Sequence, residues 1–418
     1  MPSGGVTEFG GWPRPPRWVW AAAGVAAVAV VAGVVVAHTG RHHAAASPSR
    51  PTTTASPGPG SRATAGWPSA AGACGSSVYL PRLQLAGQLA GVPGNVLAGG
   101  TGLRVVSLGG AVSGPLPGLP DHGWQVTTLV AGLGATYAFD VPCVNSTASV
   151  RVYRIVASGV QRVRVTADAL LGGPHQAWAV TYRAHSTVLT ALNGGRRLTL
   201  KARTQPVADT AAGLVVTTFH AGRPDTVELL NSRTGALLRR LAEGSSLGAA
   251  GQVLLVSLHD CGAVPAHRAC TLEAVNLTTG RPTATVELPA GRALISGDVA
   301  SPVFSPDGRL AAFQLARATP RPRFAAAVAA LPSDVAVLHL RTGRLDIVPG
   351  LELPPRTWAG LAFDATGRWL LATVSEGEYG QLLAWRQGMP GPALVTGLPG
   401  PLVGPPALLP APSWRRSG

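Results

Sequence analysis

Charged side chains are scarce in this sequence, and lysine is nearly absent. Only 13% of its 418 residues are Asp, Glu, Lys or Arg, and Lys201 is the single lysine. Glycine (53) and proline (37) are abundant, and this balance favours many short strands joined by turns over long helices. Arginine in place of lysine is also typical of a GC-rich bacterial genome, so the net charge of +15 partly reflects codon usage.

No basic run interleaved with aromatic residues occurs, because the arginines are scattered singly. Phosphate contacts require a basic patch, so we expect no nucleic-acid partner. A basic surface near anionic lipid headgroups is the simpler interpretation. His259, Asp260 and His267 are candidates for holding a metal, but a solvated loop explains them better, and no Cys-x-x-Cys spacing is present. We therefore expect no metal and no cofactor.

Residues 18–37 form a long apolar run without a charge. As a helix rising ~1.5 Å per residue, this run spans ~30 Å, the thickness of the hydrocarbon core of a bilayer. Trp12, Trp18 and Trp20 lie at its start, where indole rings favour the headgroup boundary. A cleaved signal peptide is the alternative, with a site near 44–46, but its apolar region is normally ~7–15 residues long. We expect an uncleaved transmembrane helix.

The orientation of this helix is not decided by its flanking arginines, which are equal in number on the two sides. Residues 45–70 are rich in Ser, Thr, Pro and Ala, a composition that forms no core and suits an extended linker. Four cysteines follow, an even number that suits an oxidising compartment. We expect a protein of the cell membrane with a cytoplasmic tail (1–17), a transmembrane helix (18–37), a disordered linker (38–72) and an extracytoplasmic folded domain (73–418).

The four cysteines allow three pairings. Cys261 and Cys270 flank an insertion within one apparent hairpin, and a bond between them would close that loop. Cys74 would then pair with Cys143. This bond would tie the loose N-terminal end of the folded domain to the second repeat and contribute ~2–4 kcal/mol to the free energy of unfolding. Four buried thiols are the alternative.

Two stretches read almost as one: Phe-Ser-Pro-Asp-Gly-Arg-Leu-Ala-Ala-Phe at 304–313 and Phe-Asp-Ala-Thr-Gly-Arg-Trp-Leu-Leu-Ala at 363–372. A second hairpin, with a Thr-Gly turn, recurs at 228–237, 273–283 and 337–347. Glycine permits the positive φ that such turns demand. Strict and looser copies together place turn glycines at Gly110, Gly159, Gly195, Gly235, Gly280, Gly343 and Gly388.

The gaps between these glycines are 49, 36, 40, 45, 63 and 45 residues, which indicates a period near ~40–45 residues, the length of one four-stranded propeller blade. We therefore predict an all-β fold, a seven-bladed β-propeller, with strands A to D in each blade from the central channel outward. For the last blade the pattern predicts strands at 359–363, 369–374, 382–385 and 393–396. A β-sandwich, or two unrelated β domains, is the alternative.

The segment 304–313 resembles the TolB-type, WD-repeat-like β-propeller repeats of bacterial envelope proteins. In that family Ser-Pro-Asp-Gly forms the turn between the first two strands of a blade, and 363–372 matches in part. The resemblance covers about a third of the chain. It implies the fold and a tendency to bind partners, and it carries no catalytic residues.

Several irregular segments fall on the predicted B–C loops, which share one end of the blades with the D–A connections. Long loops on one side of a rigid scaffold often carry binding residues. We predict a polar recognition rim there, and tolerated surface insertions are the alternative. The candidate binding residues are Arg317, Arg321, Arg323, Phe324, Glu376, Glu378 and Tyr379.

The leading functional hypothesis is a membrane-anchored, non-enzymatic binding module for an envelope protein, an envelope polymer or a small ligand. A propeller hydrolase or lactonase is the alternative, with a metal or carboxylates converging on the central channel; its candidates are Asp168, Asp209, Asp298 and Asp307. A sensory ectodomain is a third class, but the short tail leaves no room for an output domain.

The segment Gly244–Gly248 matches the Gly-x-Ser-x-Gly nucleophile pattern. This pattern requires a strand-to-helix elbow. We expect a linker there and no catalytic residue.

Overall fold

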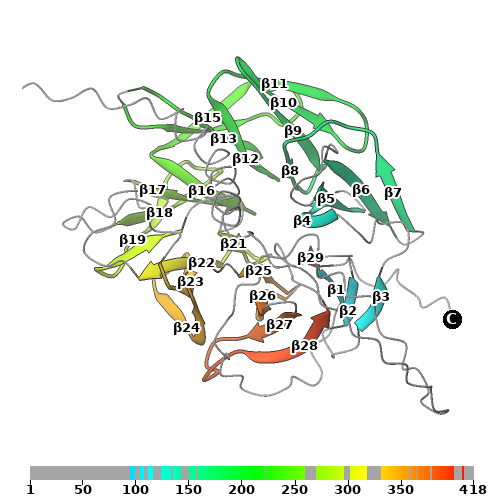
Figure 1. Ribbon diagram of the computed structural model, residues 1–418. Coiled ribbons are helices and arrows are strands. Elements are labelled where there is room, and N and C mark those ends of the chain that lie inside the picture. The colour runs from blue at the N-terminus through cyan, green and yellow to red at the C-terminus, as the bar shows by residue number, and fades with distance from the viewer. Residues whose placement is uncertain are drawn as a thin grey trace, which may run out of the picture. The chain divides into compact units, whose positions relative to one another are not determined.

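The computed structural model contains strands, turns and no described helix (Figure 1). It describes residues 95–98, 104–107, 112–115, 124–132, 135–142, 150–156, 159–221, 223–258, 270–295, 302–317, 331–355, 357, 359–364, 366–376, 379–399 and 407–408. The predicted tail, transmembrane helix and linker all lie outside these residues. No helix within the described ranges is long and apolar enough to cross a membrane. The chain divides into two compact units, Met1–Pro68 and Ser69–Gly418, and every described residue belongs to the second.

Six antiparallel sheets are each built from strands that follow one another in the chain. The first three are β4 (Trp124–Gly132), β5 (Ala135–Pro142), β6 (Arg151–Val156) and β7 (Gly159–Val163); β8 (Ala169–Leu171), β9 (Trp178–Arg183), β10 (Ser186–Ala191) and β11 (Arg197–Lys201); and β12 (Thr204–Thr210), β13 (Gly213–Thr218), β14 (Thr226–Leu230) and β15 (Leu237–Glu243). The next are β16 (Ser245–Ala250), β17 (Val253–Ser257), β18 (Thr271–Asn276) and β19 (Pro282–Glu287); β20 (Arg292–Leu294), β21 (Val303–Phe304), β22 (Leu310–Arg317), β23 (Ser333–His339) and β24 (Leu345–Leu353); and β25 (Gly360–Phe363), β26 (Leu370–Glu376), β27 (Tyr379–Trp385) and β28 (Ala393–Pro399).

A further sheet joins strands from both ends of the described chain, in the order β29-β1-β2-β3. It contains β29 (Ala407–Leu408), β1 (Asn95–Ala98), β2 (Arg104–Ser107) and β3 (Val112–Pro115). The C-terminal strand pairs with the first strand, Leu97 lying opposite Ala407. The sequence predicted seven blades of one kind; the structure has six blades of consecutive strands and this composite sheet.

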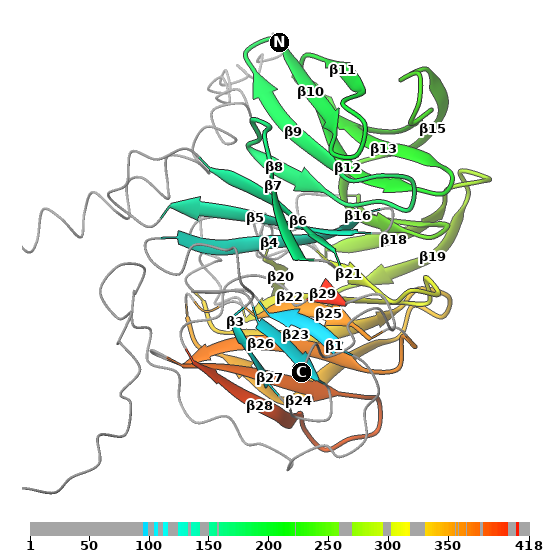
Figure 2. The same cartoon turned by 90° about the vertical axis from the view of Figure 1, so that its right-hand side faces the viewer.

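The first strand of each blade lies innermost (Figures 1 and 2). β12 contacts both β8 and β16, and β21 contacts both β16 and β25, so successive sheets meet along their innermost strands. In the five-stranded sheet, β20 and β21 share the innermost position, because both pair with β22. The sheets therefore form a β-propeller, the fold that the resemblance to TolB-type repeats implied. We name the four strands of a blade A to D from the centre outward.

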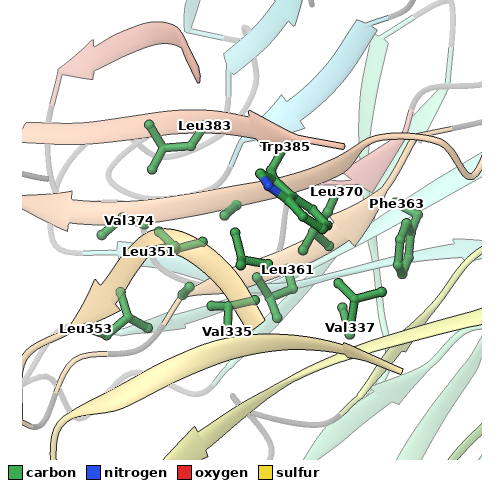
Figure 3. Packing of buried hydrophobic residues seen from close by; sticks show 14 residues of the cluster. Val335, Val337, Leu351, Leu353, Leu361, Phe363, Leu370, Val374, Leu383 and Trp385 are labelled. Atoms are coloured by element: carbon green, nitrogen blue, oxygen red, sulfur yellow. The ribbon is translucent and has the colours of Figure 1, made fainter. Parts of the chain in front are cut away.

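The core is divided among the interfaces between neighbouring blades. Between β20–β24 and β25–β28, Val335 and Val337 pack against Leu361, Phe363 and neighbouring apolar side chains (Figure 3). Separate clusters of buried apolar side chains fill the four interfaces between consecutive sheets from β4–β7 to β20–β24. Because both faces of a blade are covered, its strands are largely apolar rather than strictly alternating.

The predicted strands of the last blade match β25 to β28, and the predicted turn glycines from Gly159 onward fall between strands C and D or at the start of D. One prediction was wrong: the segment 244–248 is no linker, because Ser245–Ala250 forms β16, strand A of its blade. A nucleophile elbow requires a strand-to-helix turn, and this described segment lacks one.

Candidate functional site

Antiparallel order places the connections of each blade at alternating ends of its strands. We call the end with the A–B and C–D turns the C–D face, and the end with the B–C loops and D–A connections the B–C face. On the B–C face, long segments lie between β5 and β6, between β17 and β18, and between β22 and β23. Most residues of these three segments lie outside the described ranges.

On the C–D face, one hairpin turn recurs in nearly the same form. Asn231 Oδ1 accepts hydrogen bonds from the backbone N–H groups two and three residues later, at 2.8 and 3.0 Å. Asn276 Oδ1 does the same at 3.0 and 2.9 Å. Gly235 and Gly280 complete these turns at φ of 73° and 69°. Asn276 is thus a turn residue whose amide oxygen is already used.

The two A–B turns whose sequences suggested a repeat are also alike in structure. Ser305 Oγ accepts hydrogen bonds from the backbone N–H groups four and five residues later, at 3.2 and 2.9 Å. Asp364 Oδ1 accepts the equivalent bonds, both at 3.0 Å. Gly308 and Gly367 follow at φ of 68° and 70°. The carboxylate of Asp364 therefore replaces the hydroxyl of Ser305.

Arg317, the described member of the predicted rim whose side chain can be placed, is held by an acidic pair at the end of β22. Its guanidinium donates to Asp334 Oδ1 at 2.5 Å and lies 2.9 Å from Glu352 Oε1. Arg292, from β20, also contacts Asp334. The Asp334 side chain is only 1% exposed, against 42% for Arg317. A buried carboxylate thus fixes two arginines on the B–C face.

Electrostatics keep this cluster ionised. Burial alone would raise the pKa of Asp334, but hydrogen bonds from Arg317 and Arg292 lower it below its usual value. Hydrogen bonds to Asp334 and Glu352 raise the pKa of Arg317. The arginine is therefore a fixed cation with part of its guanidinium facing solvent.

The other predicted rim residues are not tested by this geometry. Arg321, Arg323, Phe324 and Glu378 lie outside the described residues. Glu376 and Tyr379 end β26 and begin β27 as a directly paired couple, and their side chains also lie outside the description. The acidic partners of Arg317 are Asp334 and Glu352 of its own sheet, so the association of Arg317 with Glu376 and Glu378 stays a prediction.

Two exposed aromatic side chains on the B–C face were missed by sequence reasoning. Tyr182, near the end of β9, is 45% exposed, and Phe219, just after β13, is 37% exposed. Gln205 Nε2 donates to Tyr182 Oη at 3.4 Å. Phe219 N donates to Arg203 O at 2.9 Å, which joins the start of β12 to the loop after β13. Separate short segments are thereby brought together, and no sequence pattern indicates this.

The carboxylates that a catalytic interpretation required do not converge in the described structure. Asp168 accepts a hydrogen bond from Tyr182 N at 2.7 Å. Asp209 is buried and accepts bonds from Ser232 Oγ (2.7 Å) and Trp178 Nε1 (3.3 Å). Asp307 belongs to the turn with Ser305, and Asp298 lies outside the described residues. Within the described ranges, no group of three or more His, Cys, Asp and Glu side chains is placed to hold a metal ion.

Asp140, on β5 close to the B–C face, is a buried carboxyl group that the sequence did not single out. It is 2% exposed, and its Oδ2 has no hydrogen-bond partner among the residues that the structure describes. Burial raises the pKa of Asp140 to about 7, although Arg151 opposes the shift. A carboxyl group with this pKa exchanges its proton near neutral pH.

Cys270, at the start of β18, is disulfide-bonded. Cys74, Cys143 and Cys261 lie outside the described residues. The pairing of Cys261 with Cys270, and of Cys74 with Cys143, therefore stays a prediction.

No family model matches this chain, and no curated protein matches it. Solved structures similar to it include TolB from Acinetobacter baumannii, at 13% identity and a TM-score of 0.41, covering 76% of this chain and 83% of that one. A 6-phosphogluconolactonase-like protein from Bacteroides uniformis has 11% identity and a TM-score of 0.46, with 76% and 100% covered. A puromycin-hydrolyzing peptidase from Mycobacterium tuberculosis has 12% identity and a TM-score of 0.46, with 77% and 56% covered. At these values the similarities carry no argument about function.

Proposed function

We propose that this protein is a membrane-anchored binding module whose B–C face contacts a protein or polymer of the cell envelope. In this proposal, residues 18–37 span the membrane, 1–17 lie in the cytoplasm, and 38–72 link the span to an extracytoplasmic propeller. The composite sheet β29-β1-β2-β3 acts as the seventh blade, in which pairing of β1 with β29 closes the ring.

The observation that carries the proposal is the position of the exposed aromatic side chains of the described ranges. Tyr182 and Phe219 are exposed on the B–C face. Leu237, Leu238 and Ile347 are the other large apolar side chains exposed within the described ranges, and they lie on the outer strands β15 and β24. Exposed aromatic side chains beside cations are typical of contact surfaces.

A pair of photo-cross-linking residues tests the proposal within one blade. Ala184 lies in the exposed B–C turn of sheet β8–β11, and Asn193 lies in the exposed C–D turn of the same sheet. A photoreactive amino acid placed at 184 in living cells should yield a discrete adduct, whereas the same amino acid at 193 should not. An adduct from 193 alone, or none from either position, would refute a binding role for the B–C face.

A hydrolase or lactonase remains the alternative, and Asp140 is the observation that favours it. A buried carboxyl group with a pKa of about 7 suits general acid–base catalysis at neutral pH. The purified full-length chain can be assayed on a panel of lactones and esters, beside the variant Asp140→Asn. Turnover that the substitution abolishes would support the enzyme. Equal rates for both chains would remove the support that Asp140 gives.

A further inference from the structure

The B–C face of sheets β8–β11 and β12–β15 carries exposed aromatic and cationic side chains at neighbouring strand ends. We call this set of side chains the Tyr182–Phe219 surface and define it by Tyr182, Phe219, Gln205, Arg203, Arg183 and Lys201. The two aromatic residues lie at the ends of strands B of neighbouring blades, and the side chain of each remains more than a third exposed.

Hydrogen bonds hold this surface together across the two blades. Gln205, on β12, donates to the hydroxyl of Tyr182 on β9 at 3.4 Å. Thr187 Oγ1, on β10, donates to Thr204 O at 2.9 Å. Together with the bond between Phe219 N and Arg203 O, these contacts fix both aromatic residues to the start of β12. The surface is therefore preorganised, and binding would cost little ordering of its backbone.

Charge on the surface is mainly positive. Arg183, Lys201 and Arg203 are all exposed. Asp168 is the exposed carboxylate beside Tyr182, where it accepts the hydrogen bond from Tyr182 N. A further carboxylate, Asp225, is buried in the loop after Phe219, where it accepts a hydrogen bond from the backbone of that loop. The exposed cations therefore exceed the exposed carboxylates in these turns, which favours an anionic ligand.

Arg203 has an unusual backbone conformation. Its φ is 64°, and it is the one described residue other than glycine with a positive φ. This left-handed conformation costs roughly 1–2 kcal/mol for a residue with a Cβ atom, and such strain concentrates at functional sites. Glycine occupies the positive-φ positions of the C–D turns, so an arginine here is consistent with a role for its side chain.

We propose that the Tyr182–Phe219 surface binds an acidic peptide segment of a partner protein, one that carries an aromatic or aliphatic side chain among its carboxylates. This inference rests on the proposed binding function and adds the location and the chemical class of the partner. The apolar side chain would lie against Tyr182 and Phe219, and a neighbouring carboxylate would pair with Arg203. Carboxylates further along the peptide would reach Arg183 and Lys201, which the strand register places on the other side of sheet β8–β11.

The same observations disfavour two other anionic partners. Both aromatic side chains are more than half buried, so they offer a flat contact area rather than a protruding wedge that enters a bilayer. A single-stranded nucleic acid carries one phosphate per nucleotide and needs an unbroken row of cations along its path. Asp168 interrupts the cations beside Tyr182, whereas the acidic residues of a peptide can be spaced to avoid it. Its carboxylate can instead accept a backbone N–H group of a bound peptide.

A peptide selection tests the proposal with the purified full-length chain as bait and displayed random dodecapeptides as the probe. The enriched peptides should be acidic and should contain an aromatic or aliphatic residue. The double variant Tyr182→Ser/Phe219→Ser should weaken their binding at least about tenfold. Arg203→Gly, which removes the cation without adding strain, should weaken binding several-fold.

The control for lost apolar surface is Leu237→Ser/Leu238→Ser, because these leucines are 59% and 52% exposed on β15, away from the B–C face. This control should bind as the unaltered chain does, and melting curves should confirm that all variants fold. Enrichment of neutral or basic peptides, or equal binding by the double variant, would overturn the proposal. Displacement of the peptide by oligodeoxythymidine or by phosphatidylglycerol vesicles at lower concentration would assign the surface to another partner class and overturn it as well.

The cross-link from position 184 separates this inference from the proposed function. If the double variant still forms the adduct in cells, the B–C face binds its partner elsewhere, and only the present inference fails. If the unaltered chain forms no adduct, the proposed function itself fails.

Discussion

The two ends of the propeller blades differ in how their polar groups are satisfied. On the C–D face, short turns close on themselves: Asn231 and Asn276 accept bonds from their own turns, and glycines at positive φ complete each hairpin. On the B–C face, Asp140 keeps an oxygen without a partner among the described residues, Arg203 holds a strained φ, and Tyr182 and Phe219 stay exposed. The first face uses its polar groups for the fold, whereas the second keeps a buried carboxyl group without a described partner and exposed aromatic side chains that a ligand can contact.

The B–C face nevertheless contains one internally satisfied cluster. Asp334 pairs with both Arg292 and Arg317 at the end of β22, and Glu352 also pairs with Arg317. An arginine at a loop boundary can therefore be held by carboxylates of its own sheet, as Arg317 is. Substitutions at both ends of the blades test this difference between the two faces.

The largest effect is expected at Asp140, through the pH dependence of stability. Its pKa of about 7 lies above the value in the unfolded chain, so the folded state binds the proton more tightly. The resulting stabilisation is full below the unfolded pKa and is lost as the pH rises through about 7. Asp140→Asn should remove this loss, and its stability relative to the unaltered chain should rise by up to about 3 kcal/mol between about pH 5 and pH 8. Urea unfolding across this range measures the difference, and parallel pH profiles would contradict the assignment.

Asp334→Asn should destabilise the protein by about 2–3 kcal/mol at neutral pH, because it leaves two arginines without their shared anion. Both arginines are partly exposed, so water limits the cost. The pKa of Asp334 is lowered, and its contribution is lost as the pH falls below the usual range of an aspartate. Thermal melts should show the largest difference near neutral pH and a smaller one in acid. A variant as stable as the unaltered chain would mean that the cluster does not support the blade.

Asp364→Ala should cost about 2 kcal/mol, because the buried carboxylate accepts bonds from Thr366 Oγ1 and from two backbone N–H groups. Arg183→Ala, in an exposed turn on the B–C face, is the matched substitution and should change stability by less than about 0.5 kcal/mol. The midpoints of denaturant unfolding, measured at equal m-values, compare the stabilities of the two variants. Equal losses of stability in the two variants would contradict the proposed difference between the C–D face and the B–C face.

The smallest effects are expected at the two kinds of positive-φ position. Gly280→Ala should cost about 1 kcal/mol, because φ is 69° and the added Cβ would lie 3.1 Å from Arg239 Cδ. Arg203→Gly should leave stability within about 0.5 kcal/mol, since relief of strain offsets the greater freedom of glycine in the unfolded chain. Differential scanning calorimetry resolves both. A large loss at Arg203→Gly would mean that the arginine serves the fold rather than a ligand.

The sequence predicted the repeating part of the fold because that part depends on local geometry. A hairpin turn of this kind needs a residue at positive φ. Gly235, Gly280 and Gly343 could therefore be recognised in the sequence as turn residues between apolar strands. The similarity of Ser305 and Asp364 was visible for the same reason. Strand β20 was not predicted, because its pairing with β22 depends on tertiary contacts that leave no periodic pattern in a short segment.

The site was less accessible to sequence reasoning because its contacts join distant segments. Arg292 and Asp334 are 42 residues apart, and nothing near either residue indicates the other. Tyr182 and Gln205 meet only because strands of neighbouring blades end at one face, and Phe219 is joined to Arg203 by a backbone hydrogen bond within the second of these blades. Arg317 was recognised as a residue of the B–C face, but its buried partner Asp334 was not.

Hydrogen exchange on the full-length chain, with and without a selected acidic peptide, tests the division between the two faces most directly. We predict slower exchange on binding at 182–186, 203–205 and 218–220, and unchanged exchange in the C–D turns of the same sheets at 192–196 and 231–236. Protection confined to those C–D turns, or spread equally over both ends of the blades, would contradict the account.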